Sequence, residues 1–214
     1  MMYTVYGRAT SSNVQALLWG MQELGLAYDR LDYGETFGGL ERAEFAAMTP
    51  HGQIPVLKVD EMTIWETPAI LRFLAAEHGD DRFWPSDARK RAHVDMWAEW
   101  AKHSVAAAFT GPVFWRTART SPNHQDAALI ATNIATLETE LTKANRVLAQ
   151  QPFLCGSDLT LADIQLGHVL YRYFDIDIER AELTHLRAYA DQLAQRPAYQ
   201  RTVMVSYDTL RNSF

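Results

Sequence analysis

Residues 7–26, GRATSSNVQALLWGMQELGL, join a short apolar segment to an amphipathic helix. From Val14 onward, apolar residues recur at Leu17, Leu18 and Met21, which is the spacing of one helix face. Three small polar residues stand where this helix opens: Ser11, Ser12 and Asn13. Either one of them simply caps the helix, or the open N–H groups of its first turn hold something anionic.

The segments around this helix alternate between strand and helix patterns as far as residue 78. YTVY (residues 3–6) and AYDRLDY (27–33) have strand character, and LERAEFAAM (40–48) has the character of a short helix. IPVLKV and MTIW flank Asp60-Glu61, which predicts a hairpin with a tight turn. The expected order over this region is therefore β-α-β-α-β-β-α, with the last helix in ETPAILRFLAAEHG.

The rest of the chain predicts helices only. Residues 79–87 have the composition of a linker, and strand signals fade beyond them. We expect one long helix from Ala88 to Phe109, ended by Gly111-Pro112. The further helices are expected over residues 130–148, 159–174 and 183–193. The predicted fold class is thus an α/β domain followed by an all-α domain.

Two helices carry clear start signals. Thr67 is expected at the N-cap and Pro68 at the first helical position of one helix, with Gly79 beyond its end. In LTLAD, Thr160 and Asp163 have the spacing of a capping box, with Asp in place of the usual Glu or Gln. The capping box explains Asp163 fully, so we assign it a structural role and not a catalytic one.

Composition narrows the class of protein. The 214 residues are 48% hydrophobic and 21% charged, as in a soluble globular protein, and no apolar run is long enough for a membrane span. The net charge of −6 argues against a nucleic-acid binder with a broad basic surface. The single cysteine, Cys155, excludes an internal disulfide and a cysteine-rich metal site, and it fits a reducing cytoplasm. No signal peptide is recognisable.

Four motifs, in this order and spacing, resemble the cytosolic glutathione transferases, and within them the serine-type bacterial members. The motifs are the Ser-rich turn at residues 10–13, TPHGQIPVL (49–57), ETPAILRFL (66–74) and LTLADIQL (159–166). The resemblance implies a thioredoxin-like domain over residues 1–78 that binds glutathione, and an all-helical domain over residues 88–214. It also implies no metal cofactor, a cytoplasmic role in detoxification and a homodimer. Its expected surface joins residues 72–78 to the first two C-terminal helices of the partner.

Glutathione must be activated as a thiolate, and the opening helix offers both a dipole and a hydroxyl donor for that purpose. The resemblance places Ser11 at the position of the hydroxyl residue in serine-type members. Asn13 or Ser12 is the alternative, and Tyr6 is a further one whose register fits poorly by one residue. No cysteine lies in this turn, which lowers the expectation of dithiol chemistry.

The same resemblance assigns contacts to the two ends of the tripeptide. Glu66 offers a carboxylate to the γ-glutamyl ammonium, and Thr67 with its helix start suits the neighbouring carboxylate. The backbone of Ile54 is expected to pair with the cysteinyl part, next to a cis Pro55. Gln53 is expected to bond the carboxylate or amide end of the peptide, and His51 is either a further ligand contact or a solvated surface residue.

The second substrate is expected to be an electrophilic, largely apolar molecule, with displacement of halide as one variant. The predicted pocket residues are His103, Phe114 and Trp115, with Arg116 beside them to steer an anion. Core positions are the alternative for Phe114 and Trp115. Two other functions stay open from the sequence: glutathione-dependent reduction of peroxides or disulfides, and glutathione or ligand binding without turnover.

Overall fold

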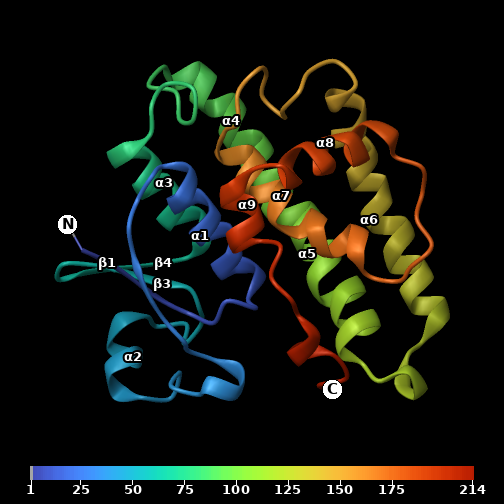
Figure 1. The fold of residues 1–214 in the computed structure, drawn as a ribbon, viewed down its shortest axis with the longest axis horizontal. Helices are drawn as coiled ribbons and strands as arrows, with labels where there is room; N and C mark the ends of the chain where they lie inside the picture. The colour runs from blue at the N-terminus through green and yellow to red at the C-terminus, as the bar shows by residue number, and fades with distance from the viewer. Residues whose placement is uncertain (1) are drawn as a thin grey trace.

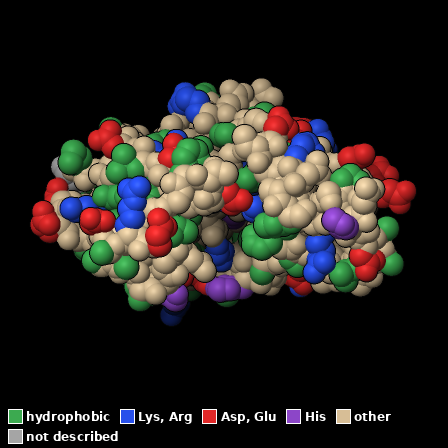
Figure 2. Space-filling view, turned by 90° about the horizontal axis from the view of Figure 1, so that it is seen from below, with side chains coloured by type: hydrophobic (Ala, Val, Ile, Leu, Met, Phe, Trp, Pro, Cys, Tyr) green, Lys and Arg blue, Asp and Glu red, His purple; other side chains and the backbone are tan. Residues whose placement is uncertain are grey.

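The structure, a computed structural model, describes residues 2–214. Figure 1 shows a lobe built on a small sheet beside a lobe of helices, and Figure 2 shows a hollow between the two lobes. The sheet lobe contains β1 (Tyr3–Tyr6), α1 (Ser12–Glu23), β2 (Asp29–Leu31), α2 (Ala43–Met48), β3 (Val56–Val59), β4 (Met62–Trp65) and α3 (Thr67–His78). The helical lobe contains α4 (Ala88–Trp100), α5 (Ala107–Phe109), α6 (Ala127–Leu148), α7 (Leu161–Asp175), α8 (Thr184–Ala194) and α9 (Pro197–Thr202).

The sheet has the strand order β2-β1-β3-β4, and only the β1–β2 pair is parallel. Val5 at the centre of β1 lies opposite Arg30 of β2 and Leu57 of β3. The turn at Asp60-Glu61 joins β3 to β4, so the predicted hairpin is confirmed. Helices α1 and α3 lie on one side of the sheet and α2 on the other (Figure 1).

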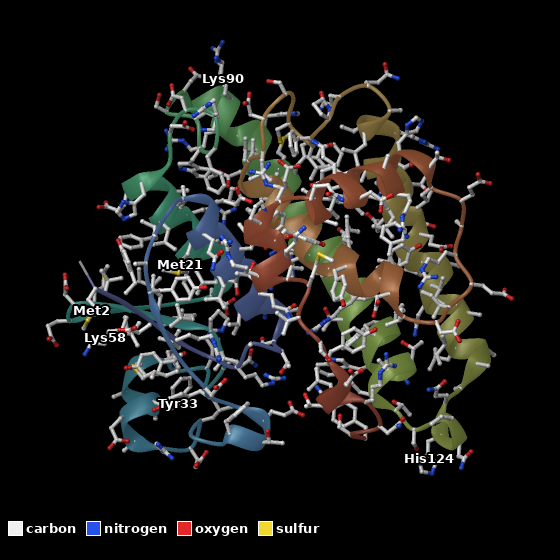
Figure 3. All side chains as sticks on the ribbon, viewed as in Figure 1. Met2, Met21, Tyr33, Lys58, Lys90 and His124 are labelled. Atoms are coloured by element: carbon white, nitrogen blue, oxygen red, sulfur yellow. The ribbon has the colours of Figure 1, made fainter. Side chains whose placement is uncertain are left out.

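Helix α1 is the element that both lobes share. Its predicted apolar stripe is buried, and so is every other residue from Val14 to Met21, because α3, α7 and α9 pack around the helix. Trp19 packs edge-on against Tyr199 of α9, with ring centroids 4.8 Å apart. Gly167 of α7 allows this packing, since a Cβ there would stand 2.7 Å from the Trp19 ring. Met21, labelled in Figure 3, is fully buried.

The sequence predicted that the long helix after the linker ends at Gly111-Pro112. In the structure it continues past these residues. Helix α4 continues through a π-helical segment (Ala101–Ala106), α5 and a second π-helical segment (Thr110–Arg119). A proline inside an α-helix removes one hydrogen bond and clashes with the carbonyl one turn back. The wider π turn accommodates it, and the Asn133 side chain of α6 donates a 2.9 Å hydrogen bond to the Pro112 carbonyl, which ties this segment to α6.

His168 lies in the middle of α7 as a buried, neutral imidazole. It is 1% exposed, and its Nε2 atom has no hydrogen-bond partner among residues 2–214. Burial, with the charge of Lys102 adding to it, lowers the pKa of His168 to about 3. In the unfolded chain, this ring would take up a proton at a pH near the ordinary pKa of histidine.

We therefore expect His168 to make the protein less stable as the pH falls from about 6.5 toward 3. Below the ordinary pKa of histidine, the unfolded state binds a proton at this ring and the folded state does not. The free energy of unfolding therefore falls by up to about 1.4 kcal/mol per pH unit. Urea unfolding of wild type and His168→Gln between pH 7 and pH 4.5 measures this slope. The slope should be shallower in His168→Gln and unchanged in His124→Gln, an exposed control labelled in Figure 3. Equal slopes in all three proteins would contradict the assignment.

Candidate active site

The opening stretch of α1 is shaped by close packing at its two ends. Gly7 follows β1 with a φ of +153°, and a Cβ there would stand 2.5 Å from Val14 and 3.3 Å from Ile54. This contact brings the start of α1 against the loop that precedes β3. Ser11 is the N-cap residue, and its carbonyl accepts the first helical hydrogen bond from Gln15 at 2.9 Å. The Ser11 hydroxyl makes no capping hydrogen bond, so it is available to a ligand.

Asn13 is held by a residue from the other lobe. The Lys102 ammonium donates a 2.7 Å hydrogen bond to the Asn13 side-chain oxygen. Because an ammonium group can only donate, this contact fixes which way the Asn13 amide faces. Its NH₂ group is the end left for a ligand, as a donor in the first turn of α1. Burial lowers the pKa of Lys102, while the charges of Glu66 and Glu99 act in the opposite direction.

A polar cleft brings most of the predicted glutathione contacts together. Residues from the start of α1, from the loop before β3 and from the start of α3 line it: Asn13, Thr49, His51, Gln53, Ile54, Pro55, Trp65, Glu66 and Thr67. The Ile54–Pro55 bond is cis, as the resemblance implied. The His51 ring packs edge-on against Trp65, with centroids 4.6 Å apart.

The start of α3 differs by one residue from the sequence prediction. Glu66, not Thr67, is the N-cap, because the Glu66 carbonyl accepts the first helical hydrogen bond from Ile70 at 2.9 Å. Thr67 is then the first helical residue and Pro68 the second, where a missing N–H still costs nothing. Glu66 has a φ of +69°, which is uncommon for a residue with a side chain. This turn presents Glu66 at the surface and keeps Thr67 buried, both at the cleft.

Tyr6 and Ser12 stand apart from the residues that line the cleft. Tyr6 lies at the end of β1, and its ring meets Tyr33 and Phe45 of the α2 side at 5.2 and 6.5 Å. Ser12 is the first residue of α1. Neither is among the residues that line the cleft described above.

The residues predicted for a second-substrate pocket differ in exposure, and of them Trp115 and Arg116 line one surface pocket together. Phe114 is 1% exposed, so it presents almost no surface to a ligand. Trp115 is 43% exposed and stands beside Phe214, with ring centroids 5.9 Å apart. The His103 side chain is 74% exposed and pairs with Glu99, four residues earlier on the same helix.

Cys155 lies away from the cleft, in the middle of the loop between α6 and α7. Burial, with the nearby Asp163 carboxylate adding to it, raises the pKa of Cys155 to about 12. The thiol is therefore protonated at neutral pH and has no nucleophilic character. Asp163 itself forms the predicted capping box with Thr160, which confirms its structural role.

Lys102 is the residue that the sequence reasoning missed. It stands in a helix that supplied no motif, and 89 residues separate it from Asn13. One signal was present in the sequence: Lys102 follows the apolar face of Trp97, Trp100 and Ala101, where a cation needs a partner from another element. Which element supplies that partner depends on how the lobes pack.

Comparisons with known proteins agree with this fold. Models of the N-terminal and C-terminal domains of glutathione S-transferase match residues 1–76 and 105–197. Glutathione S-transferase GstB of Escherichia coli K12 is 31% identical, over 95% of this chain and 99% of its own. A theta class glutathione S-transferase from Xanthomonas axonopodis pv. citri, solved with glutathione bound, is 38% identical with a TM-score of 0.90, covering 95% of this chain and 98% of that one. BmGSTD1 of Bombyx mori shares the fold at 17% identity, with a TM-score of 0.88 and coverage of 100% and 98%.

The chain belongs to the glutathione S-transferase family and is an enzyme of that class. The predictions of the family, of a thioredoxin-like domain and of a helical second domain are confirmed. Across residues 2–214, no group of three or more His, Cys, Asp or Glu side chains is placed to hold a metal ion. None of the helices described is both long and apolar enough to cross a membrane.

Proposed function

We propose that this enzyme binds glutathione in the cleft at the start of α1, stabilises its thiolate there, and transfers that sulfur to an electrophile. The observation that carries the proposal is the pairing of Asn13 with Lys102 at 2.7 Å, in the same cleft as Glu66 and Thr67. The pairing turns an N–H donor toward the cleft and adds a cation behind it. Both favour a negative charge on sulfur.

The tripeptide is anchored at its γ-glutamyl end by the turn that opens α3. The exposed Glu66 carboxylate suits the ammonium group, and Thr67 with the open N–H groups of the first turn suits the carboxylate. The backbone of Ile54 pairs with the cysteinyl residue as an added strand would. Gln53 and His51 then face the glycyl end, on the loop before β3.

Thiolate formation follows from three favourable contributions at one place. The dipole of α1 favours an anion at its first turn, the Asn13 amide donates to sulfur, and the Ser11 hydroxyl is a second donor. A hydrogen bond to a charged group contributes about 1.5–3 kcal/mol, which lowers the thiol pKa by roughly one to two. Asn13 ranks above Ser11 because only Asn13 lines the cleft and is held in position.

The transfer itself needs no further cofactor. With an aryl chloride, the thiolate attacks the carbon that bears chlorine, a C–S bond forms, and chloride leaves with the electron pair of the C–Cl bond. The thiol proton has already gone to solvent. Conjugation is favoured over disulfide exchange because the single cysteine is a half-buried, protonated thiol away from the cleft.

The test is a spectroscopic titration of bound glutathione, which follows thiolate absorbance in wild type, Ser11→Ala and Asn13→Ala. We expect the bound thiol of wild type to titrate below free glutathione. Asn13→Ala should raise that pKa by about one or more, and Ser11→Ala by less. Ser206→Ala, far along the chain in the C-terminal segment, is the matched hydroxyl control and should leave the titration unchanged.

Two results would contradict the proposal at different points. An unshifted thiol pKa in wild type would remove the transferase mechanism. A larger effect of Ser11→Ala than of Asn13→Ala would make Ser11 the main residue that stabilises the thiolate. Assays with a chloronitrobenzene and with a hydroperoxide then rank conjugation against reduction.

The proposal includes a homodimer and a cytoplasmic role in detoxification, as in the family resemblance. The expected dimer surface includes helices α3 and α4. Within one chain, Arg72 of α3 joins them by pairing with Asp95 of α4 at 2.8 Å and with Glu99 of α4. Met96, next to Asp95, is 63% exposed. An exposed apolar side chain beside these ion pairs supports burial of this face against a second copy.

A further inference from the structure

Three arginines from distant parts of the chain gather beside the turn that opens α1. Arg8, just after β1, donates to one oxygen of Glu35 at 2.9 Å, and Arg119 donates to the other oxygen of the same carboxylate. Arg172 of α7 donates to the carbonyl of Thr10 at 2.7 Å. We name Arg8, Arg119 and Arg172 the arginine cluster.

Arg172 is the least compensated member of the arginine cluster. Its residue is 3% exposed, its Nε atom is buried without a hydrogen-bond partner among residues 2–214, and no ion pair with a carboxylate is formed. The guanidinium lies over the rings of Phe114 and Tyr207, at 4.8 and 5.5 Å from their centroids. These aromatic faces stabilise a cation, but they do not neutralise it.

The cluster as a whole has an excess of positive charge. Glu35 is the one carboxylate that pairs with it within the described residues, so three guanidiniums face a single anion. Burial lowers the pKa of Arg172 to about 10, and Arg8 and Arg119 add to the effect by repulsion. Arg172 is therefore still a cation at neutral pH. The Nε atom of Arg8 is also buried without a partner.

The position of this charge relates it to the reacting sulfur. The Arg8 carbonyl accepts a 3.1 Å hydrogen bond from the backbone N–H of Ser11, and Arg172 holds the residue before Ser11. Figure 2 shows Lys or Arg side chains inside the hollow between the lobes. The cluster therefore adjoins the proposed thiolate site.

We propose that the arginine cluster binds an anionic group, a carboxylate or sulfonate, carried by the electrophilic co-substrate. This inference rests on the proposed function and names the class of acceptor: electrophiles with an acidic substituent. The lobe that supplies these residues indicates which of the two substrates carries the anionic group. Two of the three members of the cluster, Arg119 and Arg172, come from the helical lobe, whereas Gln53 and His51, which we assign to the glycyl end of glutathione, come from the sheet lobe. Such an anion would satisfy the unpaired N–H group of Arg172.

The first experiment measures binding without turnover. Calorimetry measures the affinity of the enzyme, saturated with S-methylglutathione, for 4-nitrobenzoate and for its neutral analogue 4-nitrobenzamide. We expect wild type to prefer the benzoate, and Arg172→Gln to reduce that preference roughly 10- to 100-fold. Arg8→Gln removes a more accessible member of the cluster, with 13% of its side chain exposed, and covers the case in which Arg172→Gln does not fold.

The second experiment measures turnover with acceptors that differ in one charge. The substrates are 4-chloro-3-nitrobenzoate and its methyl ester, and the quantity is the ratio of their kcat/KM values in each variant. Intrinsic reactivity cancels when this ratio is compared between variants. The ratio should fall roughly tenfold or more in Arg172→Gln and Arg8→Gln. Arg146→Gln, an exposed arginine on α6, should leave it unchanged.

The outcomes separate this inference from the proposed function. Failure of S-methylglutathione to bind removes the proposed function and, with it, the assignment to a co-substrate. Normal binding of S-methylglutathione with no preference for the benzoate overturns the inference alone. If Arg172→Gln weakens S-methylglutathione and nitrobenzoate competes with it, the cluster holds a carboxylate of glutathione, and the inference is also overturned.

Discussion

Asp163→Ala is expected to lower the free energy of unfolding by about 3–5 kcal/mol. Asp163 is fully buried and accepts four hydrogen bonds of 2.8–2.9 Å. The donors are the backbone N–H groups of Leu154 and Thr160 and the hydroxyls of Thr160 and Tyr189. Alanine would leave these buried donors without an acceptor, and each unsatisfied donor costs about 1–3 kcal/mol.

Chemical denaturation measures this loss, and Asp158→Ala is the matched control. Asp158 lies five residues earlier and is exposed, and its carboxylate accepts a hydrogen bond from the adjacent Ser157. The control should stay within about 0.5 kcal/mol of wild type. A similarly small effect of Asp163→Ala would mean that the capping box does not hold the start of α7 in place.

Lys102→Met should reduce kcat/KM at pH 6.5 about tenfold while the protein stays folded. The substitution removes the ammonium group that orients the Asn13 amide and the positive charge that favours the thiolate. Methionine retains the length and apolar character of the lysine chain, which crosses a largely buried space. The expected signature is a rise of about one in the pKa of the bound thiol, with activity recovering at higher pH.

Lys90→Met is the control for charge, because Lys90 lies at the far, exposed end of the same helical run (Figure 3). It should leave both the activity and the thiol pKa unchanged. If Lys102→Met weakened only the affinity for glutathione and left the thiol pKa as in wild type, Lys102 would be a binding residue for the tripeptide.

Sequence reasoning succeeded where a structure depends on residues close together in the chain. The apolar stripe from Val14 to Met21, the hairpin at Asp60-Glu61 and the capping box at Thr160 all depend on contacts within a few residues. Such signals are local because helix periodicity, tight turns and caps are set by neighbouring backbone groups.

It failed where a distant element compensated a local rule. Pro112 should end a helix, but a π turn and a hydrogen bond from Asn133 of α6 carry the chain through to Arg119. Glu66 is an unusual residue for a positive φ, so the sequence favoured Thr67 as the N-cap. At Pro112 the contact with α6 compensated the local rule, whereas at Glu66 the turn itself adopts the less common backbone conformation.

The family, the order of elements and the polar character of the α1 start were determined by the sequence alone, because motifs at fixed spacings encode them. Only the tertiary structure decided which charged side chains contact that start. Lys102 and Arg172 reach it from the helical lobe, 89 and 162 residues away from the groups they contact. Their roles arise from burial of charge between two lobes, and a buried charge takes its partner from whatever packing brings near, which no local pattern records.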